Sequence, residues 1–524
     1  MHPFLLVPNT PEEQLKFLRD NLGDPFVDWI LANPTDPLTE QQKQVLGLLI
    51  MAVVRGRLQT SGRGHPLLLY NLLAMGQYNE AVGATDLNYL RRLTSGEDTP
   101  TFPRSGDSLL DALTDLAVEM YGELLLTIQD SRFIPIGPLS SPAALRLRER
   151  IAESVQFPFE SASGSSIFTV SSTGMGGGIQ VEYAGPSVIN ATWRTACLID
   201  PVPSLEELIS ALPPMLEKAR RALMGRTVRI KGVCSLTGLT LPSDCVLELE
   251  WGRIRSARPS DHPQDVGDMV ERRLVSGSSG VQITDAGEVI VEADINYRLY
   301  IRDPANEAKR WPPATSQGEL QQRLTQLQLA LLLALERDAP PVLIPSWSLF
   351  IEPISQGRSV GRSDPHLFAR RQPTAITESE AFAWREWIQR LNGTDISRFG
   401  VAPRRLVRAV AERRDPFDSL VDAVICWESM FGGDREMSLR VSAAMARILR
   451  PAGPERRALR TRLSEIYDLR SRVVHGADVE IGVVQEASRE AIAYAAEAFR
   501  VILTSRQDLI NMTGHERSVT VLME

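Results

Sequence analysis

The string LRTRLSEIYDLRSRVVHG, residues 459–476, holds the side chains of this chain that are best suited to acid–base chemistry. His475 is followed by Gly476, and glycine is the residue that most often lies just past the end of a helix. We therefore expect His475 in a last helical turn, beside unpaired carbonyl groups that favour a protonated imidazolium. Such an imidazole can act as a general acid or base near neutral pH.

Two arginines lie close before this histidine, and each is a candidate ligand for an anion. A guanidinium is always charged and can bind a phosphate through two hydrogen bonds. On an ideal helix Arg470 is about 140° from His475, whereas Arg472 is only about 60° away. Asp468, however, lies four residues before Arg472 and offers it an ordinary surface ion pair. We favour Arg470 as the functional arginine and keep Arg472 as the alternative.

An amphipathic helix over residues 454–475 must position these side chains. Pro454 suits the first turn of a helix, and five apolar residues then recur along one face, namely Leu459, Leu463, Ile466, Leu469 and Val473. Strand signals are absent around this helix. Breaks at Gly and Pro instead separate further helical segments, which are predicted over residues 378–391, 404–414, 418–431, 435–449 and 480–508. Residues 378–510 are therefore expected to form an all-helical domain.

The string YDLRSRVVHG resembles the closing signature of HEPN domains of the Apea-like branch, an Arg followed after four to six residues by a His. The preceding string DSLVDAVICWESMFGG, then an amphipathic helix and then the Arg-to-His helix, follow the order found in that branch. The resemblance covers about 130 of the 524 residues. It implies a C-terminal HEPN helical bundle.

The resemblance also implies metal-independent cleavage of RNA, tRNA included, in a groove formed by two paired HEPN domains. His475 would take the proton from a ribose 2′-hydroxyl or protonate the leaving 5′-oxygen, which leaves a 2′,3′-cyclic phosphate. Arg470 would bind the phosphate and stabilise the charge that grows in the transition state. Neither a metal nor another cofactor is implied. The apolar helices around Val421 and Ala495 are candidates for the homodimer interface.

Three supporting residues are assigned by the same resemblance. Glu428, within VICWESMF, is expected to reach the motif arginine and orient it, and Asp422 is a second candidate for that role. The alternative for each acid is a solvated position or an ion pair inside the domain. Ser471 stands where some members carry Asn, Asp or His, so it is the candidate for an auxiliary polar role.

The part of the chain before this domain is expected to divide into three. Residues 1–150 show helical patterns, for example over residues 11–22 and 39–57, the latter opening with Thr39 as a cap. Residues 155–355 are expected to be a β-rich mixed region and a candidate sensor. Residues 356–377, which are rich in Gly, Pro, Ser and Arg, are expected to be a linker. The predicted fold is therefore a multidomain α+β chain.

Alternating or apolar short runs predict the strands of the β-rich region. IFTVSS and GIQVEYA flank the glycines of TGMGGG, which we interpret as a hairpin turn and not as a phosphate loop. Residues 288–300 alternate so regularly that a sheet with one solvated face is predicted. Further strands are expected over residues 187–200, 228–235 and 245–254, and helices over residues 204–224 and 319–337.

The other histidines and the cysteines do not make a metal site. His65, His262, His366 and His515 fall in loops or in a polar tail without further ligands at useful spacing. The four cysteines are scattered, which indicates neither a zinc knuckle nor a disulfide framework and fits a reducing cytoplasm. Trp384 and Trp387 are expected in a helical core.

Bulk properties complete the prediction. The formal charge of −8 argues against a basic nucleic-acid arm, although residues 455–472 hold six Arg against three acids. The start lacks the pattern of a secretion signal, and the longest apolar runs are shorter than the roughly 20 residues of a membrane span. We expect a cytoplasmic effector in antiviral defence, a toxin whose N-terminal region binds an unknown trigger. The alternative is a non-catalytic HEPN dimerisation protein that recognises a protein, peptide or glycan through its β-rich region.

Overall fold

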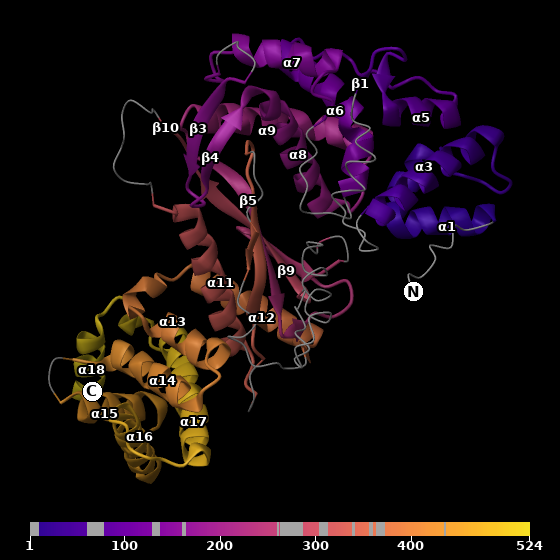
Figure 1. Cartoon of the computed structure of the whole chain (residues 1–524). Helices are drawn as coiled ribbons and strands as arrows, with labels where there is room; N and C mark the ends of the chain where they lie inside the picture. Colours follow the sequence, from indigo (N-terminus) through magenta and orange to yellow (C-terminus); the bar gives the residue numbers. More distant parts are fainter. Residues whose placement is uncertain are drawn as a thin grey trace.

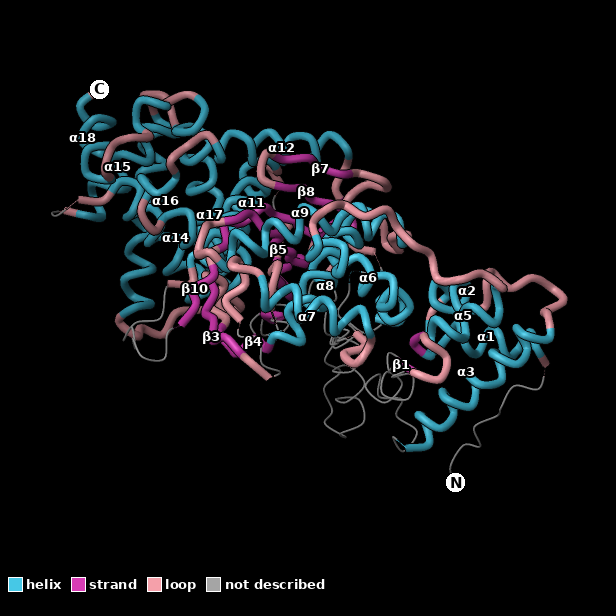
Figure 2. The backbone as a smooth tube through the Cα atoms, turned by 90° about the horizontal axis from the view of Figure 1, so that it is seen from above, coloured by secondary structure: helices cyan, strands magenta, loops and turns pink. Residues whose placement is uncertain are grey.

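The computed structural model describes residues 10–59, 78–127, 137–159, 164–258, 261, 287–302, 313–337, 341–355, 360–362, 373–433 and 436–524. It is a mixed α+β structure in which N-terminal helices, a central β region and C-terminal helices follow one another (Figure 1). Helix α1 (Pro11–Leu22) near the start of the described chain and helix α18 (Gly514–Met523) near its end lie far apart in two perpendicular views (Figures 1 and 2). The predicted α+β class is confirmed. His65, His262 and His366, and most of the predicted linker, lie outside the described residues.

The N-terminal part is helical, as the sequence predicts. Local caps explain where two of its helices begin, because Thr10 forms a capping box with Glu13 and Thr39 accepts a hydrogen bond from the backbone N–H of Gln42. The elements are α1 (Pro11–Leu22), α2 (Asp24–Ile30), α3 (Glu40–Gln59), α5 (Asp86–Ser95), α6 (Ser108–Thr127) and α7 (Pro142–Glu153), with a short hairpin of β1 (Tyr78–Asn79) and β2 (Ala84–Thr85).

The predicted strand over residues 187–200 is wrong, because this segment lies in helix α8 (Val181–Ile199). α8 packs against α6, α7 and α9 (Leu205–Leu223), so it is covered on several sides and residues 184–193 are all buried. A continuous apolar run of this kind does not distinguish a buried strand from a buried helix. Two of its hydroxyls are satisfied inside the helix, since Thr192 and Thr195 donate to carbonyl oxygens four residues earlier.

The glycine-rich string TGMGGG belongs to a hairpin, which confirms the prediction, but its last three glycines lie in a strand and not in the turn. β3 (Ser166–Ser171) pairs with β4 (Gly176–Gln180), and β10 (Leu299–Arg302) adds to the other edge of β3. The expectation that GIQVEYA continues as a strand is wrong after Gln180, where α8 begins.

A six-stranded sheet forms the centre of the molecule. Its order is β12-β11-β5-β9-β8-β7, and a separate parallel pair joins β6 (Leu239–Thr240) to β13 (Thr374–Ala375). The strands of the large sheet are β5 (Val228–Thr237), β7 (Val246–Leu249), β8 (Gly252–Ser256), β9 (Val289–Tyr297), β11 (Ile344–Ile351) and β12 (Val360–Arg362).

The prediction of one solvated sheet face is wrong for β9. Both faces of the strand are buried over most of its length, and even Glu292 is only 2% exposed. Glu292 can lie there because Arg253 and Arg255 neutralise it, with nitrogen–oxygen distances of 2.8 and 2.7 Å. The charged residue of this alternating pattern therefore forms a buried ion pair, and its charge did not indicate a solvent-exposed face of the sheet.

Helix α11 (Thr315–Ala334) connects the sheet to the C-terminal helices, since it packs on β9 as well as on α12, α13 and α17. Side chains of the bundle donate to its backbone carbonyls. Trp384 Nε1 lies 3.0 Å from the Leu327 oxygen, and Arg500 Nε lies 2.9 Å from the Leu333 oxygen. The expectation that Trp384 is a core residue is confirmed by its exposure of 0%.

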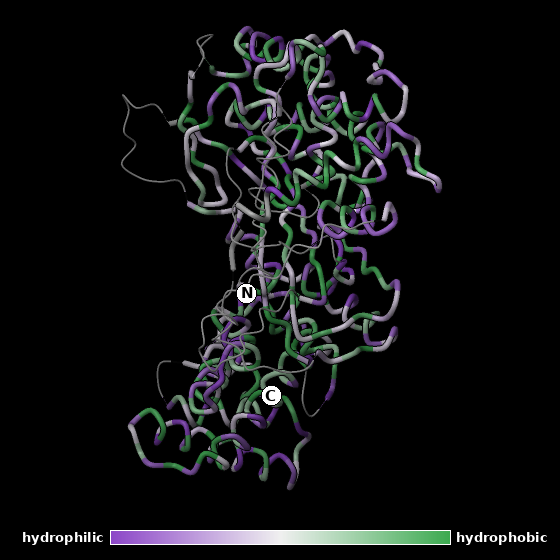
Figure 3. Tube along the Cα trace, turned by 45° about the vertical axis from the view of Figure 1, so that its right-hand side comes forward, coloured by the Kyte–Doolittle hydropathy of each residue, from purple (hydrophilic) through white to green (hydrophobic). Residues whose placement is uncertain are grey.

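The C-terminal residues form a helical bundle in the predicted order of helices. In Figure 3 hydrophobic and hydrophilic stretches alternate along the helices, as expected for amphipathic segments. The elements are α12 (Glu378–Asn392), η3 (Ile396–Phe399), α13 (Ala402–Val407), η4 (Arg408–Glu412), α14 (Pro416–Phe431), α15 (Met437–Leu449), α16 (Pro454–Val474), α17 (Ile481–Thr504), η5 (Gln507–Leu509) and α18 (Gly514–Met523).

The polar tail expected around His515 is wrong, because α18 continues the bundle and packs on α14 and α15. Arg517 is fully buried in α18 and donates to the carbonyl oxygens of Arg398, Met430 and Leu509. Three carbonyls thus replace a carboxylate partner, which a polarity profile does not reveal. Within the described ranges, no helix combines the length and apolar character needed to cross a bilayer.

Candidate functional site

Helix α16 positions the candidate catalytic residues as the sequence predicts. Its apolar stripe is buried, with Leu463 and Ile466 at 0% and 1% exposure. The helix ends at Val474, and His475 is the residue that caps it, with its backbone N–H 3.1 Å from the Ser471 carbonyl oxygen. Gly476 follows in the left-handed conformation, with φ of 74°, which glycine adopts without strain.

Arg470 and Glu428 lie together, as expected from the sequence. The Arg470 Nη2 atom of α16 is 3.7 Å from the Glu428 Oε2 atom of α14, and the two side chains keep 22% and 21% of their surface exposed. The Nε atom of Arg470 is buried and has no hydrogen-bond partner. The carboxylate therefore holds the guanidinium from one side, and part of the guanidinium still reaches solvent.

Tyr467 is a member of this cluster that the sequence analysis missed. Its hydroxyl donates to Glu428 Oε1 at 2.5 Å, so Glu428 bridges Tyr467 and Arg470. Burial, followed by the hydrogen bond and the charge of Glu428, raises the pKa of Tyr467. The available signal was spacing, because a residue three positions before Arg470 lies on nearly the same face of a helix.

His475 is not part of this cluster within one chain. Its side chain is exposed at the end of α16, and its ring makes no hydrogen bond or ion pair with the residues that the structure describes. Arg472 is also exposed, whereas Ser471 is partly buried and its carbonyl accepts the hydrogen bond that ends the helix. The structure thus brings Arg470 to Glu428 and leaves the histidine open to an external partner.

For Asp422 the sequence analysis left two alternatives, a role beside Arg470 or an ion pair inside the domain. The structure shows the ion pair. Asp422 is 1% exposed and pairs with Arg405 and with Arg413, whose Nε atom lies 2.7 Å from Asp422 Oδ2. Asp422 precedes Glu428 by six residues, which places it about 120° away around α14. Its contacts fix α13 and η4 against α14.

Exposed apolar side chains gather in the sequence around His475. Val474, Ile481 and Val483 are 53%, 56% and 46% exposed, and they lie at the end of α16 and the start of α17. Of the two residues around which an interface was expected, Ala495 is 0% exposed and belongs to the core of the bundle, and Val421 is half-buried.

The chemistry available here is that of a guanidinium beside a carboxylate and of a free imidazole. The described residues contain no group of three or more His, Cys, Asp or Glu side chains that could hold a metal ion. Comparisons with protein-family models, with curated proteins and with solved structures found no match to this chain.

Proposed function

We propose that the chain is a metal-independent endoribonuclease of HEPN type, a cytoplasmic effector whose N-terminal and β-rich regions respond to an unknown trigger. The observation that carries the proposal is the contact between Glu428 and Arg470 on the helix whose sequence resembles the HEPN signature. Since Glu428 was expected to meet the motif arginine on that resemblance, its position supports a HEPN helical bundle. Antiviral defence is the setting that fits such an effector.

The proposed reaction is transesterification of RNA. The 2′-oxygen attacks the neighbouring phosphorus as His475 takes its proton, the bond to the 5′-oxygen breaks, and an imidazolium protonates the leaving oxygen. Arg470 stabilises the charge on the pentacoordinate phosphorus, and an ion pair with Glu428 keeps the guanidinium in place. The products are a 2′,3′-cyclic phosphate and a free 5′-hydroxyl.

A second copy of the chain is proposed to complete the groove. The exposed Val474, Ile481 and Val483 support this, since they lie close together in the sequence where α16 ends and α17 begins, and exposed apolar side chains can mark a contact with another protein. A two-fold contact there would bring two copies of the exposed His475 toward each other. RNA, with tRNA among the candidates, is the proposed substrate.

One observation favours the non-catalytic alternative. Arg470 already has a carboxylate partner inside its own chain, as a purely structural arginine would. In that case the bundle is a dimerisation module, and the β-rich region recognises a protein, a peptide or a glycan.

Cleavage of RNA by the purified full chain decides between the two. Wild type is incubated with total cellular RNA and with tRNA in the presence of EDTA, with and without phage lysate as a source of the trigger. We expect fragments with 2′,3′-cyclic phosphate ends, and a loss of about 100-fold or more in the folded variants His475→Ala and Arg470→Ala.

Two matched variants serve as controls. His515→Ala removes the histidine of α18, and Arg472→Ala removes the alternative arginine, and both should cleave like wild type. Cleavage that survives in His475→Ala contradicts the assignment of the acid–base residue. Inactivity of wild type under every condition favours the binding protein.

A further inference from the structure

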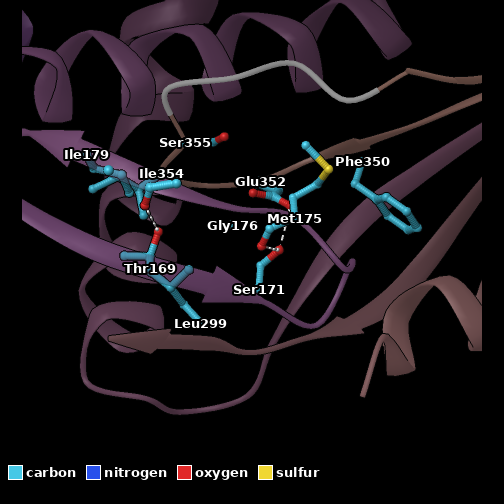
Figure 4. Close-up of a pocket in the computed structure, with 12 residues that line it drawn as sticks. Thr169, Ser171, Met175, Gly176, Ile179, Leu299, Phe350, Glu352, Ile354 and Ser355 are labelled. Carbon is cyan, nitrogen blue, oxygen red and sulfur yellow. Dashed lines mark hydrogen bonds between the residues drawn. The ribbon is translucent and has the colours of Figure 1, made fainter. Parts of the chain in front are cut away.

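A second candidate site lies in the β-rich region, where the three-stranded sheet faces the end of β11. A cavity of about 80 Å³ opens there between the β3–β4 hairpin and residues 350–355 (Figure 4). Its walls combine apolar and polar side chains. They are formed by Thr169, Ser171, Met175, Gly176, Gly177, Gly178, Ile179, Leu299, Phe350, Glu352, Ile354 and Ser355.

Glu352 is the charged group of this cavity. Its Oε1 atom accepts hydrogen bonds from the hydroxyls of Ser171, at 3.1 Å, and of Thr173, at 2.6 Å. The hydroxyl of Tyr297 is buried beside the same carboxyl group. Burial is the main reason why the pKa of Glu352 is raised, although the hydroxyl donors act against it. As a whole residue Glu352 is half-buried, and it lines the cavity.

Two other buried carboxylates show what Glu352 lacks. Glu292 is held between Arg253 and Arg255, and Asp422 likewise pairs with two arginines. Glu352 has no cation within ion-pair distance among the described residues, and its contacts are with hydroxyl groups. A carboxylate withdrawn from water without a positive partner costs free energy. A cation that enters the cavity would supply that partner.

The hairpin leaves room for such a ligand. Gly177 lies opposite Thr169 in the strand register, so a side chain at Gly177 would lie on the face of the sheet that lines the cavity. A Cβ atom placed on Gly177 meets nothing within 4 Å. Met175 and Phe350 lie to one side of Glu352, and Ile354 and Leu299 to the other (Figure 4). The space therefore suits a charged head on an apolar stem.

We propose that this cavity binds a primary alkylammonium group, carried either by a small amine or by a lysine side chain of a polypeptide, with Glu352 as its counter-ion. An ammonium is preferred to a guanidinium because Oε1 already accepts two hydrogen bonds, whereas a guanidinium binds both oxygens at once. The proposal does not rest on ribonuclease activity, because the site shares no residue with α16.

Calorimetric titration of the full chain with n-butylammonium tests the proposal. We expect saturable binding at pH 8, and no binding of n-butanol, which has the same stem without the charge. Glu352→Gln should weaken binding about tenfold or more, since a hydrogen bond to a charged group is lost. Gly177→Val should abolish binding by filling the cavity, and circular dichroism should show that both variants are folded.

Gly318→Ala is the control for the glycine substitution, because a Cβ atom at Gly318 in α11 also meets nothing within 4 Å but lies outside the cavity. This variant should bind like wild type. A lysine-containing pentapeptide and its Nε-acetylated form distinguish the sources of the ammonium: tighter binding of the free-lysine peptide than of the amine indicates a polypeptide ligand, and the reverse a small amine. Absence of n-butylammonium binding to wild type, or equal binding to Glu352→Gln, overturns the proposal.

Discussion

Glu428 in the C-terminal bundle and Glu352 at the end of β11 have similar surroundings but different partners. Each glutamate is a half-buried residue whose carboxyl group lies against a tyrosine hydroxyl, that of Tyr467 or that of Tyr297. Glu428 also pairs with Arg470, whereas the partners of Glu352 among the described residues are hydroxyl donors, and a cavity lies beside it.

The difference indicates separate roles for the two regions. In the bundle the carboxylate of Glu428 has a positive partner in the same chain, Arg470. We infer that Glu428 positions the Arg470 guanidinium. In the described part of the β region no cation lies within ion-pair distance of Glu352, so the proposed ammonium ligand would supply the missing positive charge. The two proposed roles therefore differ in the source of the positive charge. For Glu428 it is an arginine of the same chain, and for Glu352 it is the proposed ligand.

Asp422→Ala should have the largest effect on stability, because it removes a buried carboxylate that serves only to pair arginines. We expect the free energy of unfolding to fall by about 3 kcal/mol, since Arg405 and Arg413 lose their shared partner. Urea denaturation followed by circular dichroism measures the change. In the control Asp418→Ala, the lost carboxylate is 61% exposed, and the change should stay below about 0.5 kcal/mol. Equal losses in the two variants would contradict the structural role of Asp422.

Replacement of each glutamate by glutamine should shift stability in opposite directions at pH 8. A carboxyl group with a raised pKa in the folded state gives stability that is complete at low pH and is lost as the pH rises through the folded value. For Glu352 that loss begins above the ordinary value of 4.5, so Glu352→Gln should become more stable than wild type as the pH rises from 4 to 8. Glu428→Gln should instead be less stable by about 1 kcal/mol, because Arg470 loses its partner.

Denaturation curves at pH 4, 6 and 8 measure both variants. The contrast between the two regions fails if Glu352→Gln loses stability with rising pH, or if Glu428→Gln gains it.

Tyr467→Phe should have an effect no larger than that of Glu428→Gln, a loss of about 1 kcal/mol in the free energy of unfolding, because one hydrogen bond to Glu428 disappears. A double-mutant cycle with Glu428→Gln should show a coupling of at least about 0.5 kcal/mol. Tyr494→Phe in α17 is the matched control and should show no coupling with Glu428→Gln. Additive effects of Tyr467→Phe and Glu428→Gln would show that the two side chains act independently.

The sequence predicted the bundle well because its signals are local. Caps, glycines and prolines mark where α12, α14 and α16 begin and end, and a regular apolar stripe on α16 fixes the buried face. The contact between Glu428 and Arg470 was predicted from the family resemblance and not from a local signal. Tyr467 escaped notice because its hydroxyl has a partner that lies 39 residues away in the chain.

The β region was predicted less well because burial there depends on distant elements. α8 looked like a strand, since helices on several sides remove the polar face that marks a surface helix. β9 looked half-solvated, since the charge of Glu292 gave no hint of Arg253 and Arg255 on the neighbouring strand.

By itself the sequence determined the helical nature of α1 and α3 and of the bundle from α12 to α17, the end of α16 at His475 and the hairpin around Gly174, because these depend on backbone preferences over a few residues. Only the tertiary structure decided which carboxylates are paired. Asp422, Glu428, Glu292 and Glu352 are all acids in apolar or alternating segments, and the sequence does not distinguish them. The packing of segments far apart in the chain decides whether each of these acids lies beside an arginine or, as for Glu352, beside a cavity.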